Sequence, residues 1–195
     1  MLASVECGRQ RLILRKALAA AGLIALGSGT AAAQGMDGAL PEAPPRPARS
    51  PDVLISNIRL DDLRLIVDEM GGAFLAAGQN ESGSPFVFAR LPDGLTLGIY
   101  SVCSDTAATD CRGVEFMAAF GSILPDGQVM EIDRSFSAVS VYKADADTVH
   151  VSRYVILDNG ITWGNLIENA AVFDALCAKV ADRLSYGPAG PPPSP

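Results

Sequence analysis

The chain has 195 residues, 49% of them hydrophobic, with 15 basic and 22 acidic side chains and one histidine. Nucleic-acid binding relies on clustered Lys and Arg side chains that neutralise phosphates, and the formal net charge of −7 argues against that class of partner. The same acidic excess disfavours binding to an anionic membrane surface.

The first 33 residues have the three parts of a secretory signal peptide. A basic segment, residues 9–16, precedes an apolar run of ten residues from Ala17 to Leu26. Small residues follow in an A-x-A pattern, which predicts cleavage between Ala33 and Gln34. An uncleaved anchor is the alternative, but a spanning helix needs about 20 apolar residues. We therefore expect a periplasmic protein without a membrane span, whose 11 basic and 21 acidic residues give a net charge of −10.

Two proline-rich segments flank the expected domain. Residues 34–52 contain five prolines and lack hydrophobic periodicity, and residues 187–195 form a second Pro/Gly-rich stretch. Proline fixes φ and lacks a backbone donor, so we expect a disordered linker and a disordered tail. Residues 53–186 are sufficient for one domain with its own hydrophobic core.

The first half of this domain is expected to hold one helix and four strands. Apolar residues from Leu63 to Met70 recur at i, i+3, i+4 and i+7, which predicts a helix, and Gly71-Gly72 ends it. Turn residues then separate runs typical of strands, the last of which alternates apolar and polar side chains. These expected strands cover residues 73–78, 86–91, 95–102 and 114–120.

The second half is expected to hold a short helix, two strands and a long helix. The short helix covers 128–136, and the strands cover 138–144 and 148–157. A continuous apolar stripe predicts the last helix over 162–185, with Thr162 as its N-cap. Strands joined by short turns cannot be parallel neighbours. The expected fold is therefore α+β, an antiparallel sheet of about six strands with helices packed on it.

The cysteines point to one disulfide. Export to an oxidising compartment predicts a bond between Cys103 and Cys111, which bracket a loop between two expected strands. Redox catalysis is the alternative, but it favours a C-x-x-C spacing, and a zinc site would need about four ligands. Cys177 is left unpaired, either as a buried thiol on the helical stripe or as a reactive one.

No catalytic residue, metal site or cofactor is predicted. His150 is the only candidate for acid–base catalysis, and no nucleophile motif accompanies it. Asp145 and Asp147 lack the further oxygen ligands of an EF-hand loop. Because aromatic residues with polar tips are favoured at interfaces, the candidate partner-binding residues are Tyr142, Tyr154 and Trp163. The alternative is that these three pack at the sheet edge and against the last helix.

Several segments occur in an order typical of a known family. They are the helix ending in Gly-Gly, a hairpin around Pro85, and the stretches LGIYSVC (97–103), CRGVEFMAAF (111–120), VYKAD (141–145) and YVILDNGIT (154–162). In this pattern, residues 59–184 resemble the YbjN-like family of bacterial proteins, described as sensory transduction regulators. The resemblance implies a fold similar to type III secretion chaperones, no known catalytic activity, and a loop cysteine pair shared among exported members. The tryptophans that the family often carries near its second and last helices are absent from 131–136 and 171–174.

Our preferred hypothesis is an exported, non-enzymatic regulatory domain that binds another protein or a peptide. One alternative is a hydrolase that acts on an envelope component. The sequence alone does not show which of its carboxylates would come together in an active site. Another is a structural envelope protein that forms a homodimer through its last helix.

Overall fold

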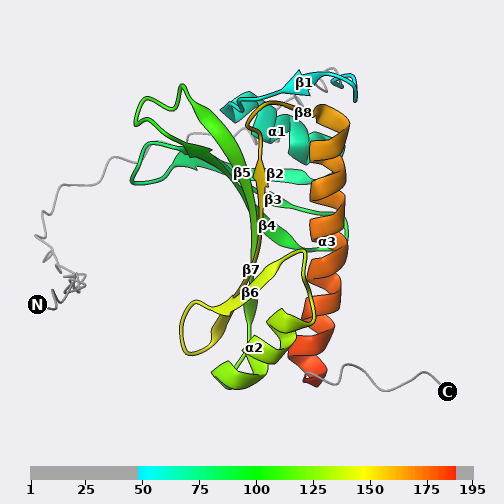
Figure 1. The fold of residues 1–195 in the computed structure, drawn as a ribbon. Coiled ribbons are helices and arrows are strands. Elements are labelled where there is room, and N and C mark those ends of the chain that lie inside the picture. The colour runs from blue at the N-terminus through cyan, green and yellow to red at the C-terminus, as the bar shows by residue number, and fades with distance from the viewer. Residues whose placement is uncertain (1–47, 188–195) are drawn as a thin grey trace, which may run out of the picture. The chain divides into compact units, whose positions relative to one another are not determined.

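The computed structural model of the protein describes residues 48–187, which form three helices, a six-stranded sheet and a two-stranded sheet (Figure 1). The elements in chain order are β1 Leu54–Ile55, α1 Leu60–Glu69, β2 Ala73–Gln79, β3 Pro85–Arg90, β4 Thr96–Cys103, β5 Cys111–Gly121, α2 Asp126–Arg134, β6 Ser140–Lys143, β7 Thr148–Ile156, β8 Ile161–Thr162 and α3 Trp163–Tyr186.

The main sheet is antiparallel throughout, with the strand order β2-β3-β4-β5-β7-β6. Helices α1 and α3 pack on one face of it, and α2 lies at one end against β6 and α3 (Figure 1). At both ends of the sheet the strand hairpins bend away from α3. The face opposite α3 is therefore concave, and no helix of the described chain covers it (Figure 1). The α+β fold and the six-stranded antiparallel sheet are confirmed.

The core lies between the sheet and helices α1 and α3. Alternation along β5 buries Val114, Phe116 and Ala118, as expected for a strand with one face in the core. Helix α3 presents a buried stripe to these residues, and the Phe116 and Phe173 rings lie 5.8 Å apart. The Thr162 hydroxyl accepts a hydrogen bond from the Asn165 amide at 3.2 Å, which confirms the expected N-cap.

The expected elements all form, with shifts of a few residues at their ends. Helix α2 begins at Asp126, two residues before the expected start, because Pro125 is its N-cap. The two-stranded sheet was not predicted. It joins Leu54 to Thr162 and Ile55 to Ile161 across the chain.

Contacts with the domain extend back to Arg49, inside the segment expected as a linker. The Gly164 amide donates to the carbonyl of Pro51 at 2.8 Å, and the Arg49 guanidinium lies 4.6 Å from the centroid of the Trp163 ring. The expected leader with its Ala33–Gln34 cleavage site, most of the linker and the tail lie outside the described residues. Within residues 48–187, none of the helices has the length and apolar character needed to cross a membrane.

Candidate functional site

Aromatic side chains gather on the face of the main sheet that no helix of residues 48–187 covers. We call this surface the open face. Because side chains alternate across a strand, the residues of the open face follow from the burial of their neighbours. They include Phe86, Phe88, Gly98, Tyr100, Gly113, Glu115, Met117, Tyr142, His150, Ser152 and Tyr154.

The strand register aligns part of this surface into one row. Gly78 pairs with Phe86, Phe86 with Tyr100, Tyr100 with Glu115, and Glu115 with Tyr154. Directly opposite side chains in an antiparallel sheet are neighbours. One row across five strands therefore contains three aromatic residues and a single carboxylate.

Two tyrosine rings pack against the backbone of the central strands β4 and β5. A Cβ atom at Gly98 would come within 2.5 Å of the Tyr100 ring, and one at Gly113 would come within 2.2 Å of the Tyr154 hydroxyl. Glycine is the residue that permits such a close approach, and an aromatic ring over it restores the packing that a side chain would supply. The local sequence thus creates a low, aromatic surface on β4 and β5.

The aromatic residues on the β3–β4 side form a cluster. The ring centroids of Phe86 and Phe88 are 5.2 Å apart, those of Phe86 and Tyr100 are 5.5 Å apart, and those of Phe88 and Tyr100 are 6.1 Å apart. The tilted and edge-on orientations are those that aromatic pairs prefer. This packing holds Tyr100 in place and leaves it partly buried.

The charge of Glu115 affects the pKa values of two tyrosines on the open face. Burial raises the pKa of Tyr100, and the negative charge of Glu115 raises it further. Burial is also the first cause of the raised pKa of Tyr142, followed again by Glu115. Both tyrosines therefore keep their hydroxyl protons at physiological pH, next to a carboxylate.

Two of the three candidate partner-binding residues lie on this face. Tyr142 is 42% exposed and Tyr154 is 52% exposed. The Tyr142 ring makes an edge-on contact with His150 at 5.6 Å, so the histidine also belongs to the open face. Trp163 is 1% exposed at the start of α3 and is a core residue, consistent with the alternative that it packs against the last helix.

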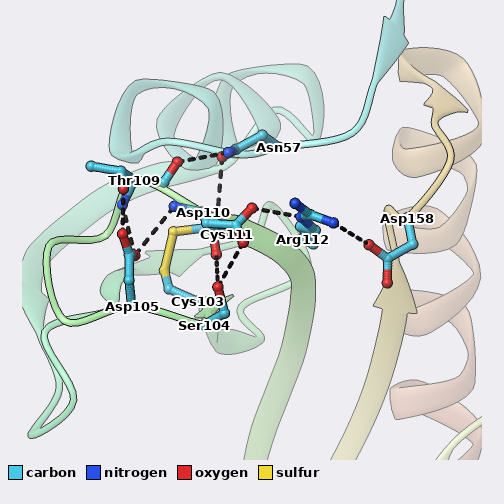
Figure 2. A network of polar contacts seen from close by, with 9 residues as sticks. All are labelled: Asn57, Cys103, Ser104, Asp105, Thr109, Asp110, Cys111, Arg112 and Asp158. Atoms are coloured by element: carbon cyan, nitrogen blue, oxygen red, sulfur yellow. Dashed lines mark hydrogen bonds and ion pairs between the residues drawn. A yellow bond between two sulfur atoms is a disulfide. The ribbon is translucent and has the colours of Figure 1, made fainter.

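The expected disulfide joins Cys103 to Cys111, where β4 and β5 enter their connecting loop (Figure 2). The loop it closes is ordered by its own side chains. The Asp105 carboxylate accepts hydrogen bonds from the Thr109 side chain and from the amides of Thr109 and Asp110. The Thr109 hydroxyl is the largest cause of the lowered pKa of Asp105.

Ion pairs connect this loop to Asp158, which follows the end of β7. The Asp110 carboxylate accepts hydrogen bonds from Ser104 and Arg112, and these two contacts are the main causes of its lowered pKa. The Arg112 guanidinium also lies 3.6 Å from Asp158 (Figure 2). Asp110, Arg112 and Asp158 line two open hollows of about 520 and 350 Å³. The Arg112 guanidinium is thus shared between two carboxylates at this end of the sheet.

The unpaired Cys177 lies in an environment that suppresses its reactivity. Cys177 is 1% exposed on α3, and burial, followed by Asp174 and Asp93, raises the pKa of its thiol to about 12. Thiolate is the reactive form of cysteine, so this environment is that of an inert buried thiol. Over residues 48–187, no three His, Cys, Asp or Glu side chains come together in a way that could hold a metal ion.

Sequence reasoning missed the central residues of the open face. Tyr100, Glu115 and the pair Phe86 and Phe88 were assigned to strands but not to a site. Alternation along each strand could have placed them on the outward side. Their alignment into one row depends on the register between strands, which alternation does not determine.

No protein-family model matches this sequence, and no curated protein matches it. Among solved structures, the chain is similar to the crystal structure described as "YbjN, a putative transcription regulator from E. coli", with a TM-score of 0.50 and 16% sequence identity. The similarity covers 69% of this chain and 96% of that one. The fold is YbjN-like. At this identity the likeness concerns the fold alone, because function resides in particular sites.

Proposed function

We propose that this chain is an exported, non-enzymatic regulatory domain that binds a segment of another protein on its open face. The observation that carries the proposal is a concave sheet face with aromatic side chains that no helix within residues 48–187 covers. Exposed aromatic residues gathered on one surface are typical of protein interaction sites.

The arrangement of the open face suits a protein segment better than a small molecule. Tyr142 and Tyr154 expose half of their surface on different strands, so the contact area is spread over the sheet. Tyrosine combines a large apolar ring with a hydroxyl and loses little rotamer freedom on binding. A partner segment lying across the strands would bury several of these rings at once.

Export to the periplasm is supported by the predicted leader and by the disulfide. A disulfide between Cys103 and Cys111 is consistent with an oxidising compartment. The regulatory part of the proposal is supported by the description of YbjN and by the resemblance to sensory transduction regulators. The net negative charge supports a protein as the regulated partner in preference to DNA.

Site-specific photo-crosslinking in the cells that export the protein tests this function. The full chain carries p-benzoylphenylalanine in place of Tyr154 on the open face or, as a matched control, in place of Tyr186, an exposed tyrosine at the end of α3. We expect a discrete adduct with another protein from position 154 and none from position 186. Equal adducts from both positions, or none from position 154, would contradict the proposal.

A further inference from the structure

We infer that the centre of the open face binds an arginine side chain of the partner segment, held between Tyr100 and Tyr142 and paired with Glu115. This inference rests on the proposed function and deepens it, because it states the chemistry that the partner must present. The site is made by three strands, β4, β5 and β6, with β7 between the last two.

Tyr100 and Tyr142 flank the middle of the open face, where Met117 of β5 lies. Tyr100 extends along β4 until its ring lies over Gly98, the residue paired with Met117 of β5. Tyr142 projects from β6, on the other side of β7, and interacts through its hydroxyl with Ser152. Ser152 is itself paired with Met117, so the two tyrosines approach the same part of β5 from opposite sides.

The carboxylate at this centre lacks a cationic partner within the described chain. Residues 48–187 contain ion pairs at Arg49, Arg64 and Arg112, and none of them involves Glu115. Glu115 is half-buried and lies directly opposite Tyr100 across β4 and β5, and its charge raises the pKa values of Tyr100 and Tyr142. From the described residues the site therefore has a negative charge and two neutral aromatic rings, and none of the ion pairs among residues 48–187 brings a positive charge to it.

A guanidinium group matches this combination better than other common groups. Its planar cation can stack on a tyrosine ring while it donates two hydrogen bonds to one carboxylate. An acidic group would be repelled by Glu115, and an aliphatic side chain would leave the carboxylate without a partner when it excluded water. The overall negative charge of the chain also favours encounter with a basic segment.

The test is a titration of the ¹⁵N-labelled protein with Nα-acetyl-arginine amide, followed by NMR. The neutral match is Nα-acetyl-citrulline amide, which has nearly the same shape without the charge. We expect the arginine derivative to shift the amide signals of Gly98, Glu115, Met117 and Ser152, and the citrulline derivative to leave them unchanged. Binding should weaken with added salt, because an exposed ion pair is screened.

Variants separate this site from general attraction to an acidic protein. Glu115→Gln should raise the dissociation constant roughly fivefold, the upper range for an exposed ion pair. Glu168→Gln, an exposed acid on α3, should change it by less than about 1.5-fold. Tyr142→Ala should weaken binding several-fold, whereas Tyr142→Phe, which keeps the ring, should retain most of it.

Each outcome decides the inference. Shifts scattered over the whole surface, equal effects of the two glutamate variants, or equal binding of the citrulline derivative would overturn it. Tighter binding of Nα-acetyl-lysine amide at the same residues would overturn the assignment to arginine. If position 154 still forms its adduct with a partner in the Glu115→Gln variant and no arginine binding is found, the inference fails while the proposed function stands.

Discussion

The disulfide offers the most quantitative test of how this domain is stabilised. Cys103 and Cys111 are directly paired across β4 and β5 and lie 8 positions apart in the sequence. Cys111 is fully buried, and Cys103 packs partly against the core. The change to make is the double variant Cys103→Ala/Cys111→Ala, because alanine fits the buried position without introducing a polar group.

The magnitude follows from the length of the closed loop. Loop-closure entropy for about nine residues corresponds to about 2.5 kcal/mol at 25 °C. The hydrogen bonds of Asp105 and Asp110 within the loop remain available to the variant, since they do not involve the cysteines. We therefore expect the double variant to fold and to lose 2–3 kcal/mol of unfolding free energy, about the loop-closure value.

Urea unfolding, with and without dithiothreitol, measures this effect. Reductant should lower the unfolding free energy of the wild-type protein to that of the double variant and should leave the variant unchanged. A Cys177→Ala variant serves as the control and should keep the full response to reductant, because its thiol is outside the disulfide. The reasoning is refuted if reductant leaves the wild-type midpoint unchanged, or if the double variant still responds to it.

Three further predictions address the core, the pH dependence and the free thiol. Phe173→Ala should cost about 3–5 kcal/mol in urea unfolding, since the ring is fully buried, whereas Tyr142→Ala, on the open face, should cost less than about 1 kcal/mol; similar losses would contradict the assignment of the two faces. Asp174→Asn should stabilise the protein at pH 7, because burial, followed by Asp93, raises the pKa of Asp174, so its ionised form disfavours the folded state. The gain should disappear as the pH falls below the unfolded value of about 3.9, where both states bind the proton, and a gain that persists there would refute this cause. Cys177 should resist iodoacetamide at pH 8 in the folded protein and react in urea, as mass spectrometry would show, because its pKa is about 12; rapid labelling of the folded protein would refute its burial.

Elements defined by local periodicity could be predicted from the sequence, and elements defined by distant pairing could not. Helix α3 has an apolar stripe of six turns, and β5 has a clear alternation, so both were assigned correctly. Strands β1 and β8 contain two residues each and exist only because Leu54 and Ile55 meet Thr162 and Ile161. Nothing in either dipeptide indicates that contact.

The same distinction explains the candidate site. Residue type alone marked Tyr142, Tyr154 and Trp163, but it does not tell a half-exposed aromatic residue from a buried one. Trp163 is covered partly by Arg49, which comes from more than 100 residues earlier in the chain and stacks on its ring. Tyr100 and Glu115 became part of the site only through the register of β3, β4, β5 and β7. A short turn joins β3 to β4, the disulfide-closed loop joins β4 to β5, and the chain between β5 and β7 passes through α2 and β6.

Two glycines shape the open face by letting aromatic rings pack close to the backbone. Glycine inside a strand weakens it, because it adds chain entropy to the unfolded state and offers no side chain to pack. Yet Gly98 and Gly113 lie on the two central strands, where a larger residue would meet the ring of Tyr100 or Tyr154. The core on the opposite face is already complete, with Ile99, Val114 and their neighbours fully buried. What the glycines add is an aromatic surface close to the backbone, and the proposed partner segment would lie on this surface across the strands.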